Sequence, residues 1–290
     1  MTSLSSNFHL SQASLQDYVE CRRRFQLRYL ENLAWPAIEA EPALENERRL
    51  QLGADFHRLV QRYLLGLPAD KLSRLVASRG QGGESLPRWW ENYLQHGAGL
   101  AGYMDIPGRT LHPETTLTAP LSSGFRLVAK YDLVAAAPDG RAAIFDWKTF
   151  RSKPKRQRLA QRLQTRVYPY LLVLAGAHLN QGNPFQPDRV EMIYWYPEFP
   201  EEPERFAYSQ AQFDADGSDL QSLVDEIESL NDDEFYLTDH VERCRFCTYR
   251  SLCDRGVKAG GLDEIEVREE AEALSTDFEI SFDQIAEIEF

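Results

Sequence analysis

The chain has 290 residues, of which 43% are hydrophobic and 27% are charged, and its formal net charge is −13. This composition is ordinary for a soluble globular protein with enough residues for one large domain or two small ones. The first residues lack a basic stretch followed by an apolar one, and the longest apolar run, near 171–177, is too short to span a membrane. The sequence therefore predicts a cytoplasmic protein without a membrane segment.

The negative charge is concentrated at the C-terminal end of the sequence. Residues 262–290 contain 11 acidic residues and one basic residue, so the other 261 residues carry a net charge of only −3. We expect an acidic, disordered tail that aids solubility, although a segment that competes with DNA or docks on a partner would have the same composition.

A basic segment lies in the middle of the chain and contains no acidic residue. Its seven cations are Arg151, Lys153, Lys155, Arg156, Arg158, Arg162 and Arg166. A solvated helix face has this pattern, and so does a surface that contacts phosphates. The segment is therefore a candidate nucleic-acid contact.

Four helices are expected in the first third of the chain, because apolar residues recur there at helical spacing. They cover 11–33, 47–66, 69–78 and 87–96, and Ser14 is the expected N-cap of the first. Strands are expected over 115–120, 125–135 and 142–149, with a turn at Pro138-Asp139-Gly140. The remaining expected elements are a helix over 156–178, strands over 190–196 and near 204–208, and a helix over 215–230. This order predicts one α/β domain over 1–261, with a helical insertion at about 67–110 and a small metal-bound cap at about 240–256.

The four cysteines are unevenly spaced. Cys244, Cys247 and Cys253 form a C-x2-C-x5-C cluster, whereas Cys21 stands more than 200 residues earlier. In a chain without an export signal, clustered cysteines indicate a metal site before a disulfide framework. Spacing alone does not separate zinc from an iron–sulfur cluster. The alternative is that Cys21 is an ordinary core residue and that the other three cysteines bind nothing.

Charged residues interrupt two apolar strands that a short turn joins. Asp146 and Lys148 are two residues apart on one strand and so share a face, while Asp132 lies on the strand before it. A two-residue turn would place Asp132 opposite Trp147; one more loop residue, or a bulge, would place it opposite Asp146 or Lys148. A structural ion pair explains Asp146 and Lys148 alone. Two adjacent carboxylates with a lysine also suit Mg²⁺ or Mn²⁺ and the hydrolysis of phosphodiesters.

Asp132 followed by Asp146-Trp147-Lys148 resembles the core motif of the PD-(D/E)xK nuclease superfamily, in its RecB-like branch. Other segments resemble motifs of that branch in the same order along residues 10–253. They are an opening helix with Cys21 (10–25), a histidine motif with His57 (53–59), a Q-x-x-x-Y helix with Gln164 and Tyr168, and the closing cysteine cluster.

The resemblance implies a restriction-endonuclease-like fold, in which helices flank a central mixed sheet. It implies Mg²⁺ or Mn²⁺ held by His57, Asp132, Asp146 and the backbone carbonyl of Trp147, and a catalytic set of Asp132, Asp146, Lys148, Gln164 and Tyr168. It also implies a structural [4Fe–4S] cluster held by Cys21, Cys244, Cys247 and Cys253, with zinc as the alternative that the spacing allows.

The implied activity is hydrolysis of DNA, as an exonuclease on single strands or duplex ends in repair or recombination. A helicase or repair protein is the implied partner. Two other functions stay open: a DNA-binding module with an inactive nuclease fold in a helicase or CRISPR adaptation complex, and an RNA-processing enzyme. The intact Asp132, Asp146 and Lys148 favour an active enzyme.

Overall fold

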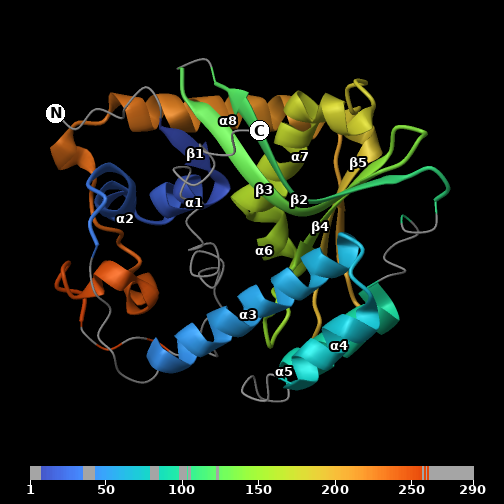
Figure 1. The fold of residues 1–290 in the computed structure, drawn as a ribbon. Coiled ribbons are helices and arrows are strands. Elements are labelled where there is room, and N and C mark those ends of the chain that lie inside the picture. The colour runs from blue at the N-terminus through green and yellow to red at the C-terminus, as the bar shows by residue number, and fades with distance from the viewer. Residues whose placement is uncertain are drawn as a thin grey trace, which may run out of the picture.

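The structure is a computed structural model that describes residues 8–34, 43–78, 85–97, 103, 106–121, 124–256, 258 and 260, with only the backbone described at 43–46. The expected acidic tail, 262–290, lies outside the described residues. None of the helices in the described ranges is both long and apolar enough to span a bilayer. A six-stranded mixed sheet forms the centre, and helices cover both of its faces (Figure 1). The predicted α/β class is therefore confirmed.

The sheet is built around the long strand β3. The strands are β1 (His9–Ser11), β2 (Thr110–Pro120), β3 (Arg126–Ala136), β4 (Ala142–Trp147), β5 (Val190–Trp195) and β6 (Glu204–Ala207). Their order is β1-β3-β4-β5-β6, with β2 paired to β3 off this path. β1–β3 and β4–β5 pair in parallel and the other pairs are antiparallel. β1 was not predicted, because three residues are too few to show an alternation.

The helices occur close to the predicted positions, with two interruptions. The longer helices are α1 (Gln12–Glu20), α3 (Ala43–Leu64), α4 (Ala69–Ser78), α5 (Ser85–Asn92), α7 (Leu163–Ala175) and α8 (Gln210–Ser229). The expected helix over 11–33 breaks at Cys21, whose backbone is extended, and continues as α2 (Arg22–Phe25) and η1 (Gln26–Leu30). The expected helix over 156–178 breaks at Arg162, between α6 (Arg156–Gln161) and α7.

The N-cap of the first helix differs from the prediction. Ser11, not Ser14, caps α1: the Ser14 amide donates to Ser11 Oγ at 3.1 Å, and the Ser11 amide donates to Ser14 Oγ at 2.9 Å. Ser14 is therefore the third residue of a capping box. Pattern reading missed Ser11 because β1 ends there, so that one residue closes the strand and opens the helix.

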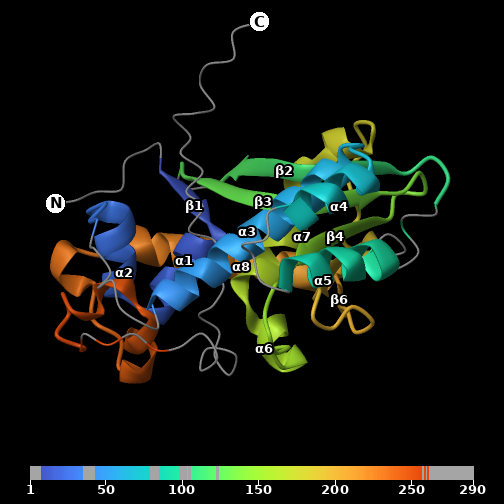
Figure 2. The ribbon, with the colours of Figure 1, turned by 60° about the horizontal axis from the view of Figure 1, so that its bottom comes forward.

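The two faces of the sheet bury separate apolar clusters. Trp147 and Trp195 face α3, α4, α5 and η2 (Tyr93–Gly97), where aromatic side chains such as Phe56 and Tyr93 stack against them. Ile144 and Tyr194 face the other way, toward α1, α7 and α8. All six residues of β4 are buried, as expected for a strand covered on both faces. Figures 1 and 2 show α3, α4 and α5 together on their side of the sheet.

The segments before α3 and after α8 lie side by side (Figure 2). The Gln26 Nε2 donates to the Asp232 carbonyl at 2.9 Å, and Tyr249 Oη donates to the Leu33 carbonyl at 2.9 Å. The C-terminal part consists of short turns, η6 (Asp232–Glu234), η7 (Val241–Phe246) and η8 (Thr248–Arg250). The fold thus brings Cys21 to the same end of the molecule as the other three cysteines.

Candidate active site

The turn between β3 and β4 sets the register of the two carboxylates. Pro138–Gly140 form a three-residue loop, since the Ala137 amide donates to the Arg141 carbonyl at 2.8 Å, and Gly140 takes a φ of 84° that favours glycine. Leu133 pairs with Phe145, so the same register continued by one residue sets Asp132 opposite Asp146. Of the open alternatives, the extra loop residue is the one that occurs.

β3 changes the direction of its side chains at Asp132. In a regular strand Tyr131 and Leu133 would face the same side. Here Tyr131 packs into the cluster under α7 and Leu133 into the cluster under α3. In β2, Thr115 pairs with Tyr131 and Pro113 pairs with Leu133. Glu114, which lies between them, has a φ of 51°. This irregularity lets Asp132 approach a residue of α3 while Asp146 faces α7.

Asp132 is held by one side chain and one backbone amide. His57 Nδ1, on α3, lies 3.1 Å from Asp132 Oδ1, and the Trp147 amide donates to Asp132 Oδ2 at 2.8 Å. Burial alone would raise the pKa of Asp132, but His57 and the Trp147 amide outweigh it and lower the pKa. Burial would lower the pKa of His57, and the charge of Asp132 raises it instead. Each member of the pair therefore stabilises the charged form of the other.

Asp146 has partners from β4 and α7. Lys148 Nζ lies 2.8 Å from Asp146 Oδ2, and Gln164 Nε2 donates to Asp146 Oδ1 at 2.6 Å. Asp146 and Lys148 are only 5% and 7% exposed. Burial raises the pKa of Asp146; Lys148 opposes that rise and Asp132 adds to it. Burial would lower the pKa of Lys148, but Asp146 outweighs it and raises the pKa. The ammonium is therefore fixed in its charged form.

Tyrosines form the wall of the site beneath these charges. The ring of Tyr168 lies 4.8 Å from that of Tyr131, whose hydroxyl donates to the Tyr168 carbonyl at 3.0 Å. Tyr194, which pairs with Asp146 in the parallel ladder, has its ring 5.8 Å below Lys148 Nζ. Its hydroxyl lies 2.7 Å from Thr165 Oγ1. Sequence reading missed Tyr194, because in a strand buried on both faces an aromatic residue reads as core.

In the part of the chain that the structure describes, no three His, Cys, Asp or Glu side chains are grouped as a metal site. We expected His57, Asp132 and Asp146 to converge on one point. In the structure His57 pairs with Asp132, whereas Asp146 contacts Lys148 and Gln164. The four carboxylate oxygens already have His57, the Trp147 amide, Gln164 and Lys148 as partners. A cation would therefore exchange places with some of these donors. Two buried, adjacent carboxylates remain a donor set suited to a hard divalent cation.

The sequence matches a family described as the PD-(D/E)XK nuclease superfamily over residues 9–254. The chain belongs to this superfamily. Its central mixed sheet flanked by helices is the restriction-endonuclease-like fold that the motif predicts.

No curated protein matches the sequence. Among solved structures, SSO0001 has 13% identity over 84% of this chain and 85% of its own, with a TM-score of 0.39. A "Putative exonuclease" from Eubacterium rectale has 13% identity over 76% of this chain and 79% of its own, with a TM-score of 0.45. Likenesses this distant do not define a function.

The basic segment of this nuclease-fold chain is partly neutralised by acidic neighbours. Lys153 and Arg156 both pair with Glu204 of β6, at 2.9 and 2.8 Å. Arg166 pairs with Asp216 and Asp219 of α8. Arg162 is buried, while the side chains of Arg151, Lys155, Arg156 and Arg158 retain contact with solvent. Not all seven predicted contacts are therefore equally available to a phosphate backbone.

The four cysteines form no disulfide, and Cys21 lies at the C-terminal end of α1. Burial raises the pKa of the Cys247 thiol to about 12, Arg24 opposes the rise, and Cys21 and Cys253 add to it. Burial also raises the pKa of Cys253, and Cys21 and Cys244 add to that rise. The fold thus brings Cys21 within electrostatic range of Cys247 and Cys253, although no three cysteines in the described ranges are grouped as a metal site.

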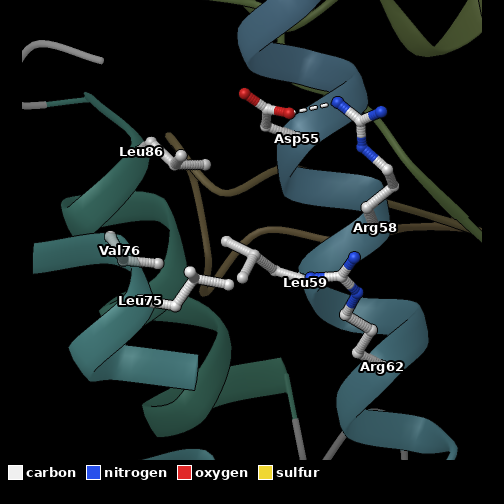
Figure 3. Close-up of a pocket in the computed structure, with 7 residues that line it drawn as sticks. All are labelled: Asp55, Arg58, Leu59, Arg62, Leu75, Val76 and Leu86. Atoms are coloured by element: carbon white, nitrogen blue, oxygen red, sulfur yellow. Dashed lines mark hydrogen bonds and ion pairs between the residues drawn. The ribbon is translucent and has the colours of Figure 1, made fainter. Parts of the chain in front are cut away.

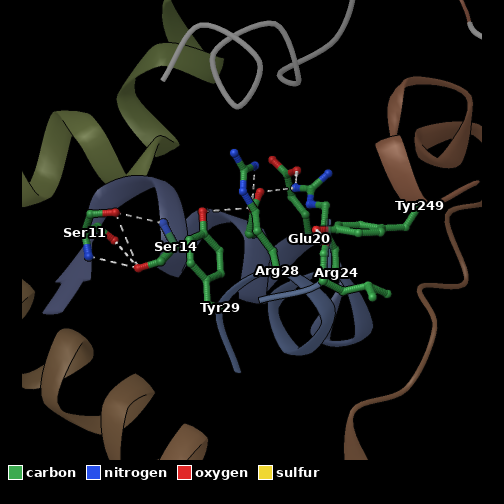
Figure 4. Close-up of polar contacts among 9 residues, drawn as sticks. Ser11, Ser14, Glu20, Arg24, Arg28, Tyr29 and Tyr249 are labelled. Carbon is green, nitrogen blue, oxygen red and sulfur yellow. Dashed lines mark hydrogen bonds and ion pairs between the residues drawn. The ribbon is translucent and has the colours of Figure 1, made fainter. Parts of the chain in front are cut away.

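A buried charge network supports the cysteine region (Figure 4). Arg24 pairs with Asp17 at 2.7 Å and with Glu20, and all three side chains are at most 9% exposed. Arg28 and Tyr29 reach the other oxygen of Asp17, at 3.3 and 3.1 Å. Among the described residues, Arg24 Nε has no hydrogen-bond partner. Asp17, Glu20, Arg24 and Arg28 are spaced by three or four residues, and their contacts form despite the break between α1 and α2 at Cys21.

A small pocket lies between α3, α4 and α5, away from the carboxylates (Figure 3). Its volume is about 130 Å³. Leu59, Leu75, Val76 and Leu86 form its apolar wall, and Asp55, Arg58 and Arg62 its rim. Asp55 pairs with Arg58. None of the predicted site residues lines this pocket.

Proposed function

We propose that the chain is a metal-dependent DNA nuclease that hydrolyses phosphodiester bonds. The observation that carries the proposal is the buried Asp146–Lys148 pair, 2.8 Å apart, with a second carboxylate, Asp132, opposite it at the end of β4. Burying two acids together costs free energy, and structural needs alone are met more cheaply by apolar residues. Such a set suits a reaction at a negatively charged centre.

Mg²⁺ or Mn²⁺ is the proposed metal, with Asp132, Asp146, His57 and the Trp147 carbonyl as the residues that would hold it. When bound, such an ion supplies an activated water and neutralises phosphate charge. Lys148 holds a proton and a positive charge beside this centre, next to the position of the substrate phosphate. Gln164 fixes the rotation of Asp146 through a 2.6 Å hydrogen bond. Tyr168 closes the wall behind them.

The proposed role of the cysteines is structural. We propose that Cys21, Cys244, Cys247 and Cys253 hold a [4Fe–4S] cluster, with zinc as the alternative. Four thiolates from the two ends of a domain spanning 1–261 would close a loop of more than 200 residues, which strongly restricts the unfolded chain. The chain's own residues, above all Arg24, supply a positive charge beside Cys247.

The proposed substrate is DNA with a free end, consumed as an exonuclease acting in repair or recombination beside a helicase or repair partner. The exposed cations of the 151–158 region support binding to a phosphate backbone. The alternative is an inactive DNA-binding module. The preserved Lys148–Asp146–Gln164 contacts favour the active enzyme, because binding alone does not require a buried lysine.

The test compares substrates that differ only in whether they have ends. End-labelled linear DNA, closed circular DNA and RNA, each single- and double-stranded, are incubated with anaerobically purified protein in Mg²⁺, in Mn²⁺ or in EDTA. The proposal expects loss of linear DNA in either metal, no loss in EDTA, and survival of the circles. Cutting of circles would establish an endonuclease, degradation of RNA alone would change the substrate, and no cleavage in any metal would favour the binding module.

A further inference from the structure

Tyr196 directly follows β5, and Lys148 directly follows the neighbouring strand β4. The two residues are close enough to interact electrostatically. Asp146 pairs with Tyr194 and Trp147 with Trp195 in the parallel ladder of β4 and β5. The Lys148 amide donates to the Trp195 carbonyl at 2.9 Å, so the pairing continues past β4 to the level of Tyr196. Side chains alternate along a strand, which places Tyr196 on the same face as Asp146 and Lys148. The buried clusters agree: Tyr194 and Tyr196 pack on one face of the sheet and Trp195 on the other.

The hydroxyl of Tyr196 is buried and lacks a protein partner. Its side chain is 0% exposed, and its Oη has no hydrogen bond to any of the described residues. Two other buried phenols on this side of the sheet are satisfied: Tyr131 donates to the Tyr168 carbonyl at 3.0 Å, and Tyr208 donates to Asp216 Oδ2 at 3.0 Å. An unsatisfied buried hydroxyl lowers stability, so its retention at this position requires an explanation.

The neighbours of Tyr196 are mainly donors. The charges of Lys148 and Arg162 both act on its phenol, and Lys148 and Arg162 have no acceptor atom to offer. The nearby Asp146 already accepts from Gln164 and pairs with Lys148. A free phenol titrates near pH 10, so this hydroxyl is a neutral donor at neutral pH. A phosphate oxygen would give this hydroxyl the acceptor that none of the described residues provides.

We propose that the Tyr196 hydroxyl donates a hydrogen bond to a non-bridging oxygen of the phosphate that is cleaved beside Lys148. The inference rests on the proposed nuclease function and adds a substrate-contacting residue to it. Asp146 and Lys148 are themselves only 5% and 7% exposed, so a phosphate that reaches them enters the same shielded region as Tyr196. In such a region a hydrogen bond to a charged acceptor is stronger than in water.

The first test is Tyr196→Phe, which removes only the hydroxyl. We expect a thermal midpoint that is unchanged or higher, because an unsatisfied group is lost, and a kcat/KM for DNA cleavage that falls about tenfold to a hundredfold. Tyr208→Phe is the matched control: it loses a hydroxyl that donates to Asp216, which is not one of the candidate site residues, and it should lower the midpoint while leaving kcat/KM unchanged. A Tyr196→Phe protein with a lower midpoint and full activity would assign a structural role and overturn the proposal.

The second test places sulfur at one or the other non-bridging position of a single linkage. Sulfur accepts hydrogen bonds poorly, so one diastereomer should slow the wild type more than it slows Tyr196→Phe. If each diastereomer slowed the wild type and Tyr196→Phe equally, Tyr196 would not donate a hydrogen bond to a non-bridging oxygen. The outcomes separate the two proposals: a wild type that cleaves no DNA overturns the nuclease function, whereas an active wild type matched by Tyr196→Phe overturns only the role of Tyr196.

Discussion

Gln164 Nε2 lies 2.6 Å from Asp146 Oδ1, which joins the first turn of α7 to the end of β4. The contact fixes one oxygen of the carboxylate and leaves the other toward Lys148. The N-terminal end of α7 also carries the positive end of the helix dipole, which stabilises the negative charge of Asp146. One glutamine thus fixes the direction of the proposed metal ligand.

His57 is predicted to affect metal affinity more than the chemical step. His57→Asn removes the ring that contacts Asp132 at 3.1 Å while keeping a polar side chain of similar reach. We expect the Mn²⁺ concentration for half-maximal cleavage to rise about tenfold to a hundredfold, the usual effect of losing a residue that supports a metal site. Titration of cleavage rate against Mn²⁺ measures it. An unchanged midpoint with His57→Asn would remove His57 from the metal site.

Cys21→Ser is predicted to release the cluster or zinc ion proposed for the cysteines and to destabilise the whole domain. Cys21 lies in electrostatic range of Cys247 and Cys253, so its loss should disrupt the site despite the sequence distance. The measurements are iron, sulfide and zinc per chain, the visible absorbance spectrum and the thermal midpoint. Tyr249→Phe is the control in the same region: it loses one bond to the Leu33 carbonyl, costs about 1 kcal/mol and should retain the metal.

The same measurements can contradict the cofactor assignment. A colourless wild type with one zinc per chain would replace the cluster but keep the four-thiolate site. A Cys21→Ser protein with the metal content and stability of the wild type would exclude Cys21 from the site.

Arg24 is predicted to stabilise the fold through its buried carboxylates. Arg24→Met leaves Asp17 and Glu20 buried without their shared cation, which costs about 3–5 kcal/mol for a broken buried pair. Arg23→Met is the control, since Arg23 pairs with Glu31 at 3.2 Å with both side chains about a third exposed and should cost less than about 1 kcal/mol. Denaturant unfolding of the two variants decides. If both variants lost the same free energy of unfolding, the buried network would stabilise the fold no more than the partly exposed Arg23–Glu31 pair does.

The basic segment is predicted to divide into DNA contacts and structural cations. Lys155 and Arg158 have no ion pair within the described ranges, whereas Arg166 pairs with two aspartates of α8. Lys155→Ala and Arg158→Ala should each weaken DNA binding and lower the slope of log affinity against log salt by about one. Arg166→Ala should lower the thermal midpoint and leave that slope unchanged. If Arg166→Ala lowered the slope and the Lys155 and Arg158 variants did not, the DNA would instead run close to α8.

Local pattern was enough to predict the elements that carry the site. The helix over 69–78 and the hairpin around Pro138–Gly140 depend on spacing and turn residues that are local in the chain, and the structure confirms both. The proximity of His57 to Asp132 followed from the order of motifs and is also observed. Whether Asp132 faced Asp146 or Trp147 stayed open, because one loop residue decides it.

Other features depend on contacts that no local pattern reveals. β1 is a strand because β3 offers it a partner, not because three residues favour extension. Lys153 and Arg156 read as DNA contacts until Glu204, some 50 residues later, is seen to pair with both. Tyr196 reads as core, and its unsatisfied hydroxyl distinguishes it from Tyr131 and Tyr208, whose hydroxyls have partners.

The central claim is that Asp146 and Lys148 perform metal-dependent cleavage of DNA. The decisive measurement is the cleavage rate of end-labelled DNA in Mn²⁺ for the wild type, Asp146→Asn and Lys148→Ala. Asp139→Asn, in the exposed turn, and Lys130→Ala, at an exposed lysine that pairs with Glu114, are the matched controls. We predict cleavage by the wild type and both controls, and at least about a hundredfold loss in both site variants, since the metal and its partners contribute several kcal/mol. DNA binding in Ca²⁺ should survive in Asp146→Asn and Lys148→Ala. Cleavage by Asp146→Asn or Lys148→Ala at the wild-type rate would contradict the account.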